Sequence, residues 1–261
     1  MTRNPVLASC LLSLAALTTA TAARAELSAE QIVDKNVAAR GGLAAWRAVT
    51  SLTIEGKLDA GGKPSHELPY VLKQKRPHKS RLEIVFKDQT SVQVYDGAQG
   101  WKVRPFLNRN EVESYTPAEA KSAAQADEFD GPLIDYAAKG TQIKLAGSEQ
   151  IEGHPAYKLS LKLRNGGQRN VWLDAGTFLE VKADGEPRKL DGKMHGVQVY
   201  FRDYKPEHGL ILPHLQETLV EGAKDPYKMT VTKVTVNEAL GDTLFQKPSA
   251  AASPESAAKK P

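Results

Sequence analysis

Apolar and polar residues alternate with a period of two along much of this chain, which is typical of β-strands that bury one face. The first run begins near Ser51, where Leu52, Ile54 and Leu58 alternate with polar side chains. Four further runs follow at hairpin distances, over residues 68–72, 82–86, 92–94 and 101–103. These five runs predict an antiparallel meander.

A second group of alternating runs follows, and its clearest hairpin turns at Asn165-Gly166-Gly167. The runs cover residues 143–145, 157–163, 168–173, 179–183, 196–203, 211–220 and 229–236. We therefore predict one curved antiparallel sheet of about eleven strands, with one apolar and one polar face. Strand twist accumulates over so wide a sheet, so we expect it to curl into an unclosed barrel.

Helical patterns occur at four places between the strand runs. Ser28 and Gln31 form a capping-box signature ahead of a helical stripe that ends at Gly41, and residues 43–47 add a short turn with Trp46. Residues 116–119 predict a capped helix start, and residues 130–140 a further helix. The predicted fold class is therefore mainly β with a helical lid (α+β), in which a few short helices cover the unclosed barrel.

The first 25 residues have the pattern of a secretion signal. Arg3 precedes a mostly apolar stretch, and Ala23-Arg24-Ala25 matches the A-x-A motif for cleavage. A membrane anchor is the alternative, but threonines and serine interrupt a stretch shorter than the ~20 apolar residues that a spanning helix needs. A lipobox at residues 7–10 is a second alternative, although it precedes the apolar stretch. We expect export to the periplasm and no transmembrane segment in the mature chain.

Cleavage after Ala25 leaves 236 residues, which fit one domain. We assign residues 1–25 to the signal peptide, 26–246 to that domain and 247–261 to a disordered tail rich in Ala, Ser, Pro and Lys. The net charge of +4 falls to +2 without Arg3 and Arg24, which argues against nucleic acid as a partner. Because Cys10 is the single cysteine, the mature chain has no disulfide.

Four sequence strings resemble those of outer-membrane lipoprotein-sorting proteins, which are relatives of the LolA/LolB-like lipoprotein carriers and receptors. They are ARGGLAAW at 39–46, YDGAQGW at 95–101, DGPLIDY at 130–136 and YKPEHGLILPH at 204–214. The order of helix, meander, helical insertion and second strand group is also similar to that superfamily. The resemblance implies that residues 26–246 form a LolA-like half-barrel domain.

The same resemblance implies an apolar cavity that takes acyl chains of lipoproteins or phospholipids, with an envelope protein as donor or acceptor. It implies neither a catalytic set nor a cofactor. The inward-facing candidates are Trp46, Leu68, Tyr70, Leu72, Leu82, Ile84, Val94, Trp101, Leu159, Leu161, Val199 and Phe201. Core packing alone would also produce such residues, but a few short helices fill a wide curved sheet poorly.

A basic run lies across one predicted hairpin and offers contacts to anionic lipid headgroups or to a charged surface. Its candidates are Lys73, Arg76 and Arg81, and Arg104 extends them. The alternative is a charged hairpin that prevents edge-to-edge pairing of strands.

The sequence contains none of the usual catalytic signatures, such as G-x-S-x-G, H-E-x-x-H, Walker A or G-x-G-x-x-G. His208 and His214, with Glu207 and Asp203, match no known spacing of metal ligands, so we expect structural or surface roles for them. We predict a carrier of acyl chains that is not an enzyme and holds no metal. An envelope protein-interaction or sensor module is the alternative function.

Overall fold

A computed structural model describes residues 26–59, 61, 66–126 and 129–249. The predicted signal peptide and residues 250–261 of the predicted tail lie outside the described residues. The fold is mainly β, with a large antiparallel sheet of 13 strands and a few short helices, which confirms the predicted fold class.

The first half of the chain supplies six strands in sequence order. They are β1 (Ser51–Asp59), β2 (Glu67–Lys75), β3 (Lys79–Phe86), β4 (Gln89–Tyr95), β5 (Gly100–Arg104) and β6 (Arg109–Ser114), with a 3₁₀ turn η1 (Pro105–Leu107) before the last. The five predicted strands of the meander are confirmed. Strand β6 was not predicted, because Val112 is its single apolar residue and gives no alternation.

The second half supplies the other seven strands of the large sheet. They are β7 (Gln142–Ile151), β8 (His154–Lys162), β9 (Gln168–Asp174), β10 (Glu180–Asp184), β13 (Val197–Glu207), β14 (Leu210–Val220) and β15 (Tyr227–Val236). A separate small hairpin, β11 (Arg188–Leu190) and β12 (Lys193–His195), lies between β10 and β13 in the chain. It was not predicted, because its strands are short and largely charged.

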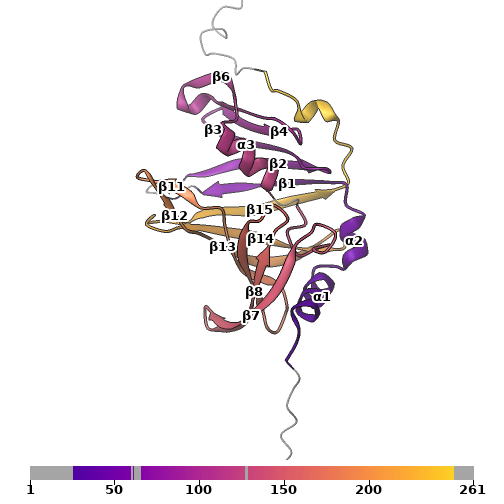
Figure 1. The fold of residues 1–261 in the computed structure, drawn as a ribbon. Coiled ribbons are helices and arrows are strands. Elements are labelled where there is room, and N and C mark those ends of the chain that lie inside the picture. Colours follow the sequence, from indigo (N-terminus) through magenta and orange to yellow (C-terminus); the bar gives the residue numbers. More distant parts are fainter. Residues whose placement is uncertain (1–25, 60, 62–65, 127–128, 250–261) are drawn as a thin grey trace, which may run out of the picture.

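The two halves meet where the first and last strands pair. Strand β1 lies between β2 and β15, and Leu52 is opposite Val236 across this seam. The sheet is not closed, since β6 and β7 are the two ends of the strand order. Figure 1 shows β1–β6 in the upper part of the molecule and β7 and β8 in the lower part.

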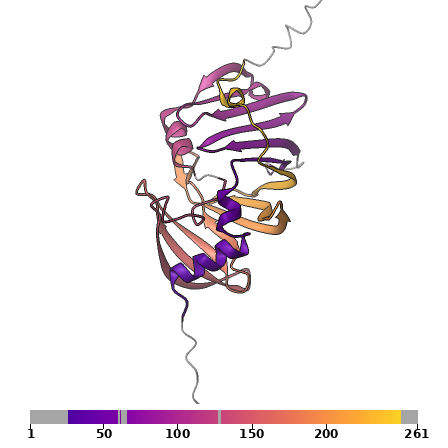
Figure 2. The same cartoon turned by 90° about the vertical axis from the view of Figure 1, so that its right-hand side faces the viewer.

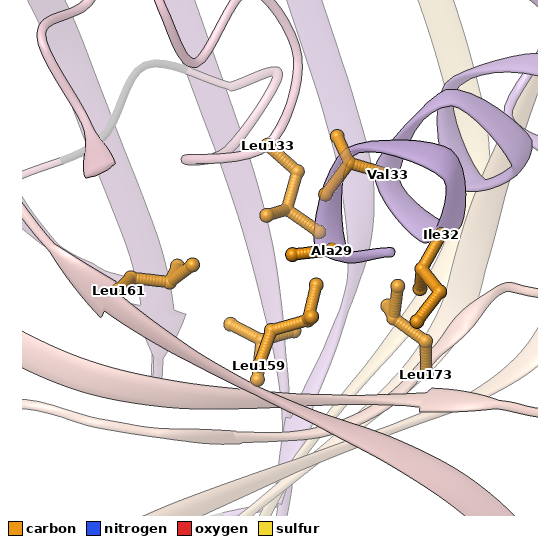
Figure 3. Packing of buried hydrophobic residues seen from close by; sticks show 8 residues of the cluster. Ala29, Ile32, Val33, Leu133, Leu159, Leu161 and Leu173 are labelled. Carbon is orange, nitrogen blue, oxygen red and sulfur yellow. The ribbon is translucent and has the colours of Figure 1, made fainter. Parts of the chain in front are cut away.

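Helix α1 (Ala29–Ala39) covers one face of the lower strands. The Ser28 side chain accepts from the backbone N–H of Gln31 and the Gln31 side chain accepts from that of Ser28, so the predicted capping box is confirmed. Figure 3 shows Ala29, Ile32 and Val33 of α1 packed against Leu159, Leu161 and Leu173. We call the face of the sheet that α1 covers the inner face.

Two other helices are short and differ in how they pack. Helix α2 (Leu43–Arg47) buries Trp46 completely, in a cluster with Leu52 and Leu212. Helix α3 (Pro117–Gln125) is capped by Thr116 and presents mainly alanines, so it has little apolar surface to bury. Both helices were predicted.

The prediction of a helix over residues 130–140 is wrong, because this segment is a series of turns. Positive φ angles at Gly131 (76°), Asp135 (54°) and Gly140 (73°) prevent a continuous right-handed helix. We call residues 129–140 the inner segment. It places Leu133 in the α1 cluster and Ile134 in the Trp46 cluster, so it fills part of the inner face.

The chain beyond β15 packs on the opposite, outer face of the first strands. Leu240 and Phe245 lie in a buried cluster with Val94, and η2 (Asp242–Phe245) carries the phenyl ring. Figure 2 shows this segment, in yellow, running alongside β1–β5. Part of the outer face of the meander is therefore covered by the C-terminal segment.

Candidate ligand cavity

A cavity of about 350 Å³ lies on the inner face near the seam. Its walls come from β1, β2, β9, β10, β13, β14 and β15, and from the start of the inner segment. Neither α1 nor the inner segment fills this space, so the central part of the inner face has an unfilled hollow.

The floor of the cavity is apolar because the pairing register of the central strands places aliphatic side chains opposite one another. Ile54 is opposite both Leu72 and Val234, and residues directly opposite in antiparallel strands share a face. Phe201 and Met229 are each opposite Gln216, which extends this surface across β13, β14 and β15. The floor is thus one continuous, largely aliphatic surface.

One wall of the cavity is polar and is built around Arg40, which follows α1. Its Nη1 donates to the backbone oxygen of Asp130 at 2.9 Å and to Glu180 Oε1 at 3.4 Å. The Tyr204 hydroxyl donates to the backbone oxygen of Glu180 at 2.9 Å. Burial, followed by the charge of Glu180, raises the pKa of Tyr204, so the phenol stays protonated and remains a donor.

A buried ion cluster fixes the start of the inner segment beside this wall. The Asp130 carboxylate accepts from Arg76 Nη2 at 2.7 Å and from Lys139 Nζ at 2.6 Å, and its side chain is 3% exposed. The Arg76 guanidinium also lies over the Phe129 ring, 4.5 Å from its centroid. The cluster therefore holds both ends of the segment from Asp130 to Lys139 at one point.

Helix α3 lies over the inner face of the upper strands. The strand pairing places Lys102 on the same side of the sheet as the cavity floor. Directly opposite residues link it to the floor residue Leu72 through Gln93 and Leu82. Its ammonium donates to both carboxylate oxygens of Glu119 in α3. This ion pair joins the helix to the sheet.

The structure brings together only some of the apolar candidates. Tyr70, Leu72 and Phe201 line the cavity. The others on the inner face are buried in the helix clusters or half-buried away from the cavity, namely Trp46, Leu68, Leu82, Ile84, Leu159, Leu161 and Val199.

Val94 and Trp101 lie on the outer face and not with the other candidates. They are opposite each other, and Val94 is also opposite Arg81, which alternates along β3 with inward-facing Leu82. They pack with Leu240 and Phe245 of the C-terminal segment. These two apolar side chains therefore pack against the C-terminal segment and do not line the cavity.

The basic candidates do not gather at one opening of the cavity. Arg76 is bound to Asp130, and Arg104 Nη2 donates to Glu113 at 2.8 Å. Arg81 is on the outer face, where it donates to Glu83 at 2.6 Å and to the backbone oxygen of Leu244 at 3.1 Å. Lys73 is opposite Arg81 and shares that outer face.

Both histidine candidates lie close to protein acceptors, although His214 Nε2 makes no hydrogen bond to the described residues. His214 Nε2 lies 3.1 Å from Glu207 Oε1, and His208 Nε2 lies 3.3 Å from the backbone oxygen of Val234. Within the described part of the chain, no group of three or more His, Cys, Asp or Glu residues could hold a metal ion.

Sequence reasoning missed the polar wall of the cavity. Arg40 lies within the string at 39–46 that carried the family resemblance, but its burial left no signal in the sequence. Glu180 left no distinct signal either, because Glu180 and Lys182 alternate with the apolar residues of the run at 179–183, as residues on a polar strand face do.

The fold is an unclosed antiparallel half-barrel with an apolar hollow on its inner face. The chain has the LolA-like fold. It is similar to a LolA superfamily protein from Nitrosomonas europaea, with a TM-score of 0.56 and 14% identity over 85% of this chain and 99% of that one. This similarity confirms the fold that the sequence strings implied.

Two further solved structures have similar folds. One is a putative outer membrane lipoprotein-sorting protein domain from Vibrio parahaemolyticus, with a TM-score of 0.54 and 14% identity over 83% of this chain and 95% of that one. The other is a DUF1329 family protein from Desulfovibrio piger, with a TM-score of 0.54 and 12% identity over 84% and 97%. No protein-family model matches the sequence, and no curated protein matches it.

Among the residues that the structure describes, no helix is long and apolar enough to cross a membrane.

Proposed function

We propose that this chain is a periplasmic binding or carrier protein that takes acyl chains of lipoproteins or phospholipids into the inner-face cavity, without catalysis. The unfilled apolar cavity carries this proposal. Its volume of about 350 Å³ falls within the range of about 300–1,000 Å³ that small-molecule sites occupy. The predicted signal sequence and the LolA-like fold support it.

Binding of the acyl chain would draw mainly on the hydrophobic effect. Each buried CH₂ group contributes about 0.8 kcal/mol, so even part of an acyl chain gains several kcal/mol in the cavity. Release requires only a partner that offers comparable burial, so the transfer needs neither ATP nor a cofactor. An envelope protein as donor or acceptor fits this scheme.

The first test is native mass spectrometry of the mature protein, purified from its own cell envelope without detergent. We expect an acylated species in a fixed ratio to protein, and a protein mass that begins at Glu26. A protein mass with no adduct that also stays unchanged when lipids are added contradicts the proposal. A stable complex with one envelope protein, unaffected by lipid removal, would then favour the interaction module instead.

Leu72→Trp provides a test within the cavity, because the indole would occupy the floor between Ile54 and Leu82. We expect at least a tenfold loss of affinity for a fluorescent polyene fatty acid. Val71→Trp is the matched control, since Val71 is the neighbouring residue on the outer side of the same strand. Thermal unfolding of both variants separates lost binding from lost folding, and equal affinity in the two folded variants would place the ligand elsewhere.

A further inference from the structure

The guanidinium of Arg40 has an unused donor beside the cavity. Arg40 is 5% exposed and lines the hollow, and its Nε is buried without a hydrogen-bond partner. Within the described part of the chain, both of its side-chain hydrogen bonds come from Nη1. A buried N–H without an acceptor costs free energy, so an acceptor that arrives with a ligand would remove this cost.

Arg40 is also held rigidly in place. Its guanidinium lies over the Trp46 ring, 4.4 Å from the centroid, and Trp46 Nε1 donates to the Arg40 backbone oxygen at 3.0 Å. The contact with Asp130 fixes the other side of the guanidinium. A guanidinium oriented before binding loses little conformational entropy when it receives an anion.

The charges and shape of the cavity point to one kind of ligand. Among the charged side chains of the lining, Arg40 keeps an N–H without an acceptor in the described residues, and the Glu180 carboxylate is bound to its Nη1. The aliphatic floor with Ile54 and Leu72 belongs to the same hollow. Its volume is near the lower end of the range for small-molecule sites, which favours one acyl chain over several.

We infer that the cavity binds a single acyl chain with its oxyanion head group, carboxylate or phosphate, inside against Arg40, and with its tail along the floor. This inference rests on the proposed function and specifies its ligand class. A planar guanidinium pairs well with carboxylate and phosphate oxygens, and such charge-assisted hydrogen bonds are stronger in a site shielded from water.

The test compares three ligands of equal chain length on the delipidated wild-type protein: a saturated fatty acid, the alkyl phosphate and the fatty acid methyl ester. Isothermal titration below the micelle concentration gives each affinity. We expect at least one oxyanion to bind tenfold or more tightly than the ester, a difference of about 1.4 kcal/mol. The oxyanion that binds with the higher affinity identifies the head group.

Equal or tighter binding of the ester overturns this inference and leaves the proposed function intact. Failure of all three ligands to bind overturns both. Arg40→Gln should reduce the preference for the oxyanion over the ester to less than twofold. Arg47→Gln is the control, because Arg47 is exposed and paired with Asp135. Since Arg40 also holds the inner segment, the wild-type comparison decides the question if Arg40→Gln does not fold.

Discussion

The pair of Lys102 and Glu119 shows how one buried charge positions a helix. Lys102 is an inward-facing residue with its side chain 8% exposed, and a buried ammonium is stable only with a partner. Burial by itself raises the pKa of Glu119, but hydrogen bonds from Lys102 and Thr116 outweigh it and lower the pKa to about 2. The pair thus attaches α3, which has little apolar surface, to the sheet.

The pair predicts a specific loss of stability in acid. The folded-state pKa of Glu119 lies below its ordinary value of 4.5, so its contribution is complete above pH 4.5 and is lost as the pH falls toward 2. We expect Glu119→Gln to cost about 1 kcal/mol of unfolding free energy at pH 7, since the carboxyl side chain is 41% exposed and solvent screens the pair. The variant should also flatten the pH dependence of stability between pH 4.5 and 2, measured by urea unfolding.

Glu67→Gln is the control for this variant, because the pair of Lys57 and Glu67 is exposed on both sides. The unfolding free energy of Glu67→Gln should differ from that of the wild type by less than about 0.5 kcal/mol at every pH. The prediction fails if the two variants lose stability equally with pH.

The sequence predicts which residues of one strand share a face. It does not predict on which side of the sheet that face lies. A period of two correctly grouped Leu72 with Tyr70 and Val94 with Val92. It does not tell which group faces inward, and Val94 was assigned to the cavity because the outer cover by Phe245 has no local signal. The polar wall around Arg40 and Glu180 was missed for the same reason, since tertiary packing creates it.

The inner segment depends on one carboxylate for its position. Asp130→Asn keeps the shape of the side chain but removes the charge that compensates Arg76 and Lys139. Loss of one partner from a buried pair costs about 3–5 kcal/mol, and the partial exposure of both cations lowers our expectation to about 2–3 kcal/mol. Hydrogen exchange should be faster over residues 129–140 than in the wild type.

Asp135→Asn is a matched control in the same segment. Asp135 pairs with the exposed Arg47, and asparagine tolerates its positive φ angle well. We expect less than about 0.5 kcal/mol of destabilisation and unchanged exchange over residues 129–140. Faster exchange in both variants would mean that the ion cluster is not what holds the segment.

Elements were predictable where local patterns are strong. Clear alternation identified the long strands, and capping boxes identified α1 and α3, since these signals arise within a few residues. Strand β6 has a single apolar residue, Val112, so only its pairing with β5 defines it. The helix predicted for the inner segment was wrong, because its caps resemble helix ends while Gly131 and Asp135 adopt positive φ.

The seam between β1 and β15 joins the two halves of the whole molecule. It pairs residues from opposite ends of the described chain, such as Leu52 with Val236. At Gly56 the three strands approach so closely that an added Cβ would lie 1.9 Å from the Thr230 oxygen and 2.8 Å from the Tyr70 ring. Only glycine fits there without a shift of the backbone.

Gly56→Ala should therefore destabilise the whole molecule. Overpacking costs about 1–3 kcal/mol, and we expect about 3 kcal/mol here because the nearest atom belongs to the backbone. Thermal unfolding should show this loss as a lower Tm. Gly241→Ala is the control, since its added Cβ meets Thr243 Oγ1 at an ordinary 3.6 Å. A Tm for Gly56→Ala equal to that of the control would show that the seam relaxes freely.

The position of β15 at the seam also determines when, during synthesis, the large sheet can be completed. Strand β1 is among the first parts of the sheet to be synthesised, yet its partner β15 is the last. Every shorter nascent chain leaves one edge of β1 unpaired, so the central sheet cannot form before Val236 has been added. The order of the strands thus delays completion of the sheet until synthesis of the described chain is nearly finished.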